Sequence, residues 1–218
     1  MGSKFVHLQC VDDLLSFAVE TPSDAQAASK ILRSTGQWLE VVPGMASVVV
    51  RFDAAILDQA TAERLLRNAL ADGIPPLEAS GTVIEIPVVY GGASGPDLDD
   101  LCERLGLTED EIIALHTGRE YRVELTGFTP GFAFVGGLDE RLQVPRREEP
   151  RQRVAAGSIG IADAYTGLYA LASPGGWTLI GRTPFPLFDA DGAEPFVLKA
   201  GMPVRFRAVS AREAGFES

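Results

Sequence analysis

Three arginines of this chain stand beside turn-forming residues, where a guanidinium group can bind a carboxylate. Arg146 and Arg151 belong to the segment PRREEPR at 145–151, and Arg182 lies in SPGGWTLIGRTP at 173–184. A planar guanidinium holds a carboxylate through two parallel hydrogen bonds and stays charged at any working pH. The alternative role is structural, because arginines in turn-rich folds often bind loop carbonyls. The two roles weigh equally for Arg151 and Arg182, and the structural one is favoured for Arg146.

Small residues next to these arginines can present backbone N–H groups to an anion. Ser173, Gly175 and Gly176 could form a nest of donors around an oxyanion, and Thr183 follows Arg182 directly. We therefore take Ser173, Gly175, Gly176 and Thr183, with the three arginines, as candidates for substrate binding.

Candidates for acid–base or nucleophilic catalysis are few. A Ser-His-Asp hydrolase needs a nucleophile oriented by a base, but the chain has no GxSxG motif and its two histidines are His7 and His116. His116 is expected in the last turn of a helix, where a structural role is favoured over that of a base. Ser158, Tyr165 and His116 are the candidate catalytic residues, and none has a defined role.

Metal, nucleotide and nucleic-acid sites lack their usual sequence signals. The chain contains no HxxxH, HExxH or CxxC spacing, and no lysine follows a GxxxxG run, so neither a metal site nor a P-loop is expected. The net charge of −11 lies in the first 126 residues, which have 9 Lys and Arg against 20 Asp and Glu. Such acidity argues against binding to DNA or RNA, since that binding depends on neutralised phosphates. In contrast, the 63 residues from Gly127 to Asp189 are neutral, which favours them for an anion site.

The same 63 residues carry a resemblance to a known family. The run GFTPGFAFVGGLDERLQVPRREEPRQRVAAGSIGIADAYTGLYALASPGGWTLIGRTPFPLFD resembles the family that includes allophanate hydrolase subunit 1, KipI-like kinase inhibitors and the B-type subunits of 5-oxoprolinase. Similar stretches lie upstream, WLEVVPGMASVVVRFD at 38–53, IPVVYGGASGPDLDDLC at 86–102 and LHTGREYRVELTGF at 115–128. The resemblance covers about residues 38–210.

The resemblance implies a cyclophilin-like barrel and an activity shared with other subunits. By resemblance, the chain works with a homologous C-type subunit, and possibly a third subunit, to open 5-oxoproline to glutamate with ATP hydrolysis. Such a reaction has to activate a stable lactam carbonyl while a cation or a cluster of N–H groups holds the substrate carboxylate. ATP would then be bound by, or together with, a partner subunit.

Two other functions fit the same family. One is a KipI-like inhibitor whose barrel binds a sensor histidine kinase, and the other is a carboxyltransferase-type subunit acting on allophanate or a carboxylated urea. An exposed apolar patch would favour the inhibitor. The Ser-Ser-Lys machinery of amidases is not visible, so hydrolysis of allophanate by this chain alone is disfavoured.

The chain departs from the family pattern near its centre. Asp163 replaces a glycine, Tyr165 replaces a glutamine, and Ala155 and Ala170 replace prolines. A phenol offers one O–H where an amide offers two N–H groups and a carbonyl, so Tyr165 would change how a substrate is held.

The expected elements give an α+β protein of two domains. For the first domain, 1–76, the pattern predicts strands at 5–10, 14–19, 39–42 and 47–52, one helix from Thr21 to Gly36 and another from about Asp58 to Gly73. The order β-β-α-β-β-α suggests a ferredoxin-like α/β sandwich. Residues 72–81, DGIPPLEASG, read as the linker.

The second domain, 82–218, is expected to be a cyclophilin-like β-barrel fed by a helical insertion. A strand is predicted at 83–90, helices after Asp97 and after a Thr108–Glu111 capping box, and strands with turns from Tyr121 to the last strand at 203–209. Phe128, Phe132 and Phe134 are expected to form a hydrophobic wall, which could line either a pocket or a subunit interface.

The remaining features suggest a cytoplasmic protein. No run of 18 apolar residues occurs, the N-terminal residues lack the apolar stretch of a secretory signal, and Cys10 and Cys102 do not make a disulfide framework. We therefore expect no membrane insertion and no export.

Overall fold

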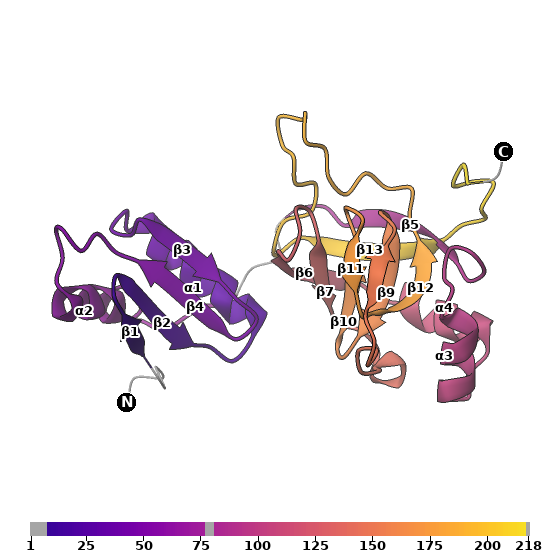
Figure 1. Ribbon diagram of the computed structural model, residues 1–218, viewed down its shortest axis with the longest axis horizontal. Helices are drawn as coiled ribbons and strands as arrows, with labels where there is room; N and C mark the ends of the chain where they lie inside the picture. The colour runs from indigo at the N-terminus through magenta and orange to yellow at the C-terminus, as the bar shows by residue number, and fades with distance from the viewer. Residues whose placement is uncertain (1–7, 77–80, 217–218) are drawn as a thin grey trace. The chain divides into compact units, whose positions relative to one another are not determined.

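The computed structural model describes residues 8–76 and 81–216, and the chain divides into two compact units, Met1–Glu78 and Ala79–Ser218 (Figure 1). The sequence-predicted linker at 72–81 falls partly outside the described residues, as do positions 5–7 of the first predicted strand.

The first unit has the predicted element order of two strands, a helix, two strands and a helix. Its elements are β1 (Gln9–Val11), β2 (Leu14–Ala18), α1 (Pro22–Ser34), β3 (Glu40–Pro43), β4 (Ser47–Arg51) and α2 (Gln59–Ala69). The strands pair antiparallel in the order β1-β2-β4-β3. The ferredoxin-like order is β-α-β-β-α-β, with one strand before the first helix, whereas here both β1 and β2 precede the first helix. That designation stays a prediction.

Local sequence explains both helices of this unit. Thr21 caps α1 through a reciprocal capping box with Asp24, and Asp58 accepts a hydrogen bond from the N–H of Thr61 to cap α2. Alternate strand residues, among them Leu15, Phe17, Val48 and Val50, are buried in one hydrophobic core with apolar residues of both helices.

The second unit is built on a closed barrel. Within residues 81–216 the barrel strands follow the order β10-β7-β6-β13-β5-β12-β9, with β5 and β13 parallel and the other pairs antiparallel. The elements are β5 (Ile84–Tyr90), α3 (Leu98–Leu105), α4 (Glu109–Thr117), β6 (Tyr121–Thr126), β7 (Ala133–Gly136), the 3-10 turn η1 (Glu140–Leu142), β8 (Arg151–Val154), β9 (Ser158–Ala162), β10 (Tyr165–Leu168), β11 (Ser173–Gly175), β12 (Thr178–Arg182) and β13 (Pro203–Ala208). The predicted barrel with a helical insertion is thereby confirmed. The cyclophilin-like designation stays a prediction.

Three features outside the barrel wall position the candidate residues. Helices α3 and α4 lie together beside the barrel (Figure 1). β8 and β11 form a separate two-stranded ribbon. A second cluster of buried side chains, which includes Phe132, Tyr169 and Trp177, is distinct from the main barrel core. The ribbon and this second cluster bring together residues that are far apart in the sequence.

Among the described residues, no helix is long and apolar enough to cross a membrane. In the same ranges, no group of three His, Cys, Asp or Glu side chains is arranged to hold a metal ion.

Candidate functional site

Arg151 is held by a buried carboxylate that is distant in the sequence. Its Nη2 donates to Oδ1 of Asp97, whose side chain is only 5% exposed, and Nη1 of Arg147 lies 3.3 Å from the same oxygen. Oδ2 of Asp97 accepts from the backbone N–H of Leu179 at 2.7 Å. Asp97 therefore ties β8 and β12 to the start of α3. Its carboxylate makes no capping bond to that helix.

Part of Arg151 is left without a protein partner. Its Nη1 is buried and has no hydrogen-bond acceptor among the described residues. Pairing with Asp97 fixes the guanidinium and leaves Nη1 enclosed by the protein, which favours the structural role of Arg151.

The other predicted ribbon residues lie close to Arg151. Ser173 is 6% exposed, and its hydroxyl has no partner in the described part of the chain. Gly175 pairs with Arg151, and a side chain at position 175 would collide with the hydroxyl of Tyr169. The carbonyl of Gly176 accepts from the N–H of Arg147 at 2.7 Å. Gly175 therefore allows close packing of the ribbon on Tyr169, which is a steric reason for glycine at this position.

Tyr169 is a polar group in an apolar cluster. Burial raises the pKa of its hydroxyl to about 12, and the nearby Arg146 and Arg151 oppose that rise. The hydroxyl therefore stays protonated at neutral pH.

Next to the ribbon lies a group of ring contacts that we call the aromatic wall, made of Phe128, Phe132, Phe134, Tyr165, Tyr169 and Trp177. Phe132 is at its centre, with ring centroids 4.8 Å from Phe134, 5.0 Å from Tyr169 and 5.8 Å from Trp177. The guanidinium carbon of Arg146 lies 5.5 Å from the centroid of Trp177. This is within the range of a cation–π contact and holds an exposed cation at the edge of the wall.

Tyr165 joins the wall through its contact with Phe134 and bonds to a second acidic residue. Its ring lies 6.4 Å from Phe134, and its hydroxyl donates to the carboxylate of Glu124. Gly136 makes room for this carboxylate, because a side chain there would overlap it. Burial raises the pKa of Glu124, and the bond from Tyr165 and the charge of Arg122 lower it in part.

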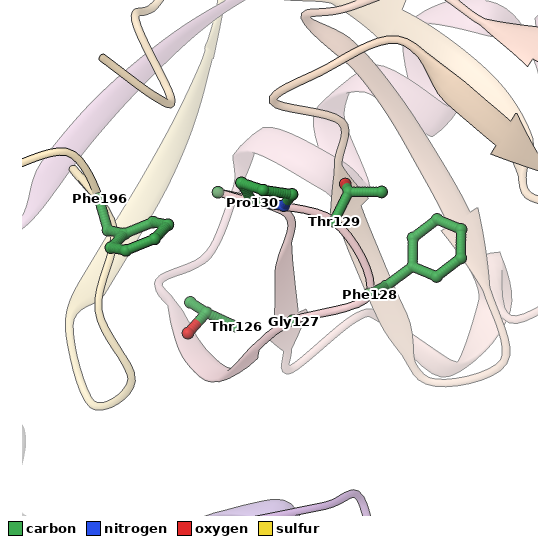
Figure 2. Close-up of a pocket in the computed structure, with 7 residues that line it drawn as sticks. Thr126, Gly127, Phe128, Thr129, Pro130 and Phe196 are labelled. Carbon is green, nitrogen blue, oxygen red and sulfur yellow. The ribbon is translucent and has the colours of Figure 1, made fainter. Parts of the chain in front are cut away.

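The GFTPGF segment forms a small cavity beside Phe128, a member of the wall. A space of about 300 Å³ is lined by residues 126–131 and Phe196. Figure 2 shows Phe196 facing the loop from one side, while Phe128 lies on the other side. Phe128 has a φ of 77° and is 68% exposed. A bulky residue in the left-handed region costs about 1–3 kcal/mol and points to a constraint other than packing.

His116 lies inside the barrel. Its Nδ1 is 2.6 Å from the Tyr90 hydroxyl and its Nε2 is 3.0 Å from Oγ1 of Thr166, while the ring stacks on Phe206 at 4.4 Å. Complete burial lowers the pKa of His116 to about 3. The imidazole is therefore neutral at physiological pH and has both nitrogens occupied.

A separate group lies at the start of β9 and the end of β12 and consists of Ser158, Arg182 and Thr183. Ser158 and Arg182 are paired across the ladder, and the N–H of Thr183 donates to Gly157 at 2.8 Å. The Thr183 hydroxyl accepts from the N–H of Phe185 at 3.0 Å. Since His116 bonds to other partners, it is not the base that would activate Ser158.

The structure therefore gathers some predicted residues and separates others. Tyr165 belongs to the aromatic wall, and near the wall lie Arg146, Arg151, Ser173, Gly175 and Gly176. In contrast, His116 lies in the barrel core, and a separate group consists of Ser158, Arg182 and Thr183. Asp97, Glu124 and Tyr169 were absent from the sequence-based candidates. The GPD turn of Asp97 was interpreted only as a helix start. Glu124 lies on β6 without a local motif, and Tyr169 directly follows β10.

A family model described as carboxyltransferase domain, subdomain C and D, matches residues 4–198. The chain belongs to this family. It is 46% identical over 171 residues to the B-type subunit of 5-oxoprolinase from Escherichia coli O157:H7, covering 77% of each chain. To the corresponding 5-oxoprolinase subunit of Bacillus subtilis (strain 168) it is 38% identical over 186 residues, covering 81% of this chain and 78% of the relative. The crystal structure of the conserved uncharacterized protein PH0987 from Pyrococcus horikoshii matches with a TM-score of 0.59 and 35% identity, over 95% of this chain and 99% of that one.

Proposed function

We propose that this chain is the B-type subunit of a 5-oxoprolinase, which opens 5-oxo-L-proline to L-glutamate with hydrolysis of ATP. The observation that carries the proposal is the identity of 46% and 38% to 5-oxoprolinase subunits of this type from two bacteria, each over more than three-quarters of this chain. The proposed partners are a homologous C-type subunit and a third subunit, and the proposed compartment is the cytoplasm.

In this proposal the substrate binds to a part of the aromatic wall in which Phe128 takes no role. The lactam ring would lie against Phe134 and Tyr165, while its carboxylate would be held by the exposed Arg146. The position of Arg146 over Trp177 supports this arrangement. The Nη1 of Arg151 and the hydroxyl of Ser173 are buried, so neither would touch the substrate directly.

The acid–base chemistry would take place at Glu124 and Tyr165. A half-buried carboxylate with a raised pKa can accept a proton or a hydrogen bond near neutral pH more readily than an exposed one. Glu124 has this character, and Tyr165 holds it in place. Glu124 would accept the lactam N–H. ATP would supply the phosphoryl group that activates the carbonyl.

The proposal requires partner subunits, since the wall lacks a nucleophile. Within the described residues, neither Ser158 nor Ser173 has a hydrogen bond to a histidine. A site that lacks an activated nucleophile is what one chain would contribute to a shared active site.

The test is an assay of ATP hydrolysis and glutamate release with 5-oxoproline. It is run on the chain alone and after co-expression with its C-type and third subunits. We expect activity only in the assembled complex, and we expect Arg146→Gln to raise KM with little change in kcat. The matched control is Arg205→Gln, which removes an exposed arginine of β13 whose nearest acid, Glu120, is 3.9 Å away. A verified complex without activity would reject the proposal.

One observation favours a second function, that of a KipI-like inhibitor. Phe128 is exposed on a strained loop, and a rigid, exposed aromatic residue is typical of a protein-binding surface. Under that function, Phe128→Ser would abolish binding to a histidine kinase partner. Under the oxoprolinase function, the same variant in the assembled complex would keep its turnover.

A further inference from the structure

A second cavity lies away from the aromatic wall, beside the YGGASG segment at 90–95. It has a volume of about 440 Å³, and its lining includes residues 91–94, Arg182 and Phe216. A glycine-rich loop, an arginine and an aromatic ring thus share one space. None of these groups contributes to the substrate site proposed above.

The loop is fixed on strand β12 by contacts that only glycine permits. The N–H of Gly91 donates to the carbonyl of Ile180 at 3.1 Å. A side chain at Gly95 would collide with that same carbonyl. Gly91 has a φ of 66° and Gly92 a φ of 48°, which is the left-handed region that glycine adopts without strain. The loop is therefore held rigidly next to Arg182, at the end of β12.

The loop leaves backbone donors unused. The carbonyl of Gly91 accepts from the N–H groups of Ser94 at 3.0 Å and Gly95 at 2.8 Å, as in the first turn of a helix. Within the described part of the chain, the N–H groups of Gly92 and Ala93 have no acceptor. Successive free N–H groups in a tight glycine-rich turn form a concave site for an anion.

Arg182 is oriented before any ligand binds. Its Nε donates to the carbonyl of Ala156 at 3.2 Å, and its guanidinium carbon lies 5.1 Å from the ring centroid of Phe216. Among the described residues, its two terminal nitrogens have no hydrogen-bond or ion-pair partner. A stacked guanidinium with both terminal groups free is suited to bidentate contact with an oxyanion.

From this arrangement we infer that the cavity binds a phosphate group, either inorganic phosphate or the terminal phosphate of a nucleotide. The guanidinium can serve two phosphate oxygens, and the loop N–H groups can serve a third. A carboxylate has only two oxygens and would leave part of this donor set unused. The opposing charge is Glu109, whose Oε1 would be 2.9 Å from a side-chain carbon at Gly91.

The experiment titrates the isolated chain with inorganic phosphate while the backbone amides are followed by NMR. We expect the Gly92 and Ala93 amides to shift in a saturable way that persists at about 0.15 M salt, where diffuse attraction between exposed charges is largely screened. Arg182→Gln should weaken phosphate binding by about tenfold or more. Arg205→Gln, which removes the same charge from another part of the barrel, should leave it unchanged.

Two further measurements identify the source of the phosphate and test the effect of the neighbouring negative charge. Titration with ATP should shift the same amides at lower concentration than phosphate if a nucleotide is the natural source, and at equal or higher concentration if free phosphate is. Glu109→Gln should tighten binding by about threefold, because it removes a negative charge from behind the loop.

The inference is overturned if phosphate gives no saturable shift, if Arg182→Gln binds as well as the unmodified chain, or if 5-oxoproline alone shifts these amides. These measurements need no partner chain and no turnover. Their failure is therefore distinguishable from a failure of the proposed oxoprolinase function.

Discussion

Arg151 and Arg182 are the same residue type in similar turn-rich segments, but their surroundings differ in one respect. Arg151 faces Asp97, a buried carboxylate whose two oxygens accept from Arg151, Arg147 and the N–H of Leu179. Arg182 has a carbonyl and a ring as neighbours and, among the described residues, no acid within ion-pair distance. An arginine with a buried acid stabilises the fold, whereas an arginine held only by neutral groups keeps its charge for a ligand.

The largest effect should follow from breaking the cluster of Asp97 with Arg147 and Arg151. Asp97→Asn would leave the partly buried Arg151, and with it the more exposed Arg147, without a counter-charge. Removing one member of a buried ion pair typically costs about 3–5 kcal/mol. We expect the free energy of unfolding of the barrel unit to fall by that amount, measured by urea denaturation followed through the near-UV signal of Trp177. A loss of less than about 1 kcal/mol would show that water compensates these arginines.

The next test compares Arg151→Gln and Arg182→Gln in two measurements, the free energy of unfolding and the binding of phosphate. Arg151→Gln should lower the free energy of unfolding by about 1.5–3 kcal/mol, the usual value of a hydrogen bond to a charged group. Arg182→Gln should lower it by less than about 0.5 kcal/mol, as for most surface substitutions. In the phosphate titration the order should be opposite, with only Arg182→Gln weakened. Equal losses of stability for the two variants would contradict the distinction between a structural and a ligand-binding arginine.

The sequence predicted features that depend on neighbouring residues, but not partners that are distant along the chain. Motifs that act within a few residues were found, such as the start of α1 at Thr21 and the capping box of Thr108 with Glu111 that begins α4. The barrel followed from dense turns and short strands. The partner of Arg151 could not be found in this way, since Asp97 lies 54 positions away and its turn resembles an ordinary helix start. That pair joins β8 of the separate ribbon to the start of α3, and only the folded second unit brings the two together.

Tyr165 shows the same limit for a functional difference. Its departure from the family's glutamine was visible in the sequence, but its partner, Glu124, was not. The two meet because β6 and β10 both pair with β7, and because Gly136 between them has no side chain. A substitution that looks isolated along the chain is therefore half of a pair in the fold.

The Glu124–Tyr165 pair is intermediate between the two arginine sites, because its acid is half-buried and held by a neutral donor. Tyr165→Phe removes the hydrogen bond that lowers the pKa of Glu124, so that pKa should rise further above its usual value. A carboxyl whose folded pKa is raised disfavours folding at neutral pH, and this cost is recovered as the pH falls through the folded pKa. The variant should therefore be less stable than the unmodified chain at pH 7, by about 0.5–1.5 kcal/mol for one hydrogen bond, and the difference should shrink as the pH falls.

Carbon-13 NMR of the Glu124 carboxyl measures its pKa, and urea denaturation between pH 7 and pH 4 measures the difference in stability. A difference in stability that is independent of pH would mean that Tyr165 acts through packing on Phe134, and the proposed role of Glu124 as a hydrogen-bond acceptor tuned by Tyr165 would be withdrawn.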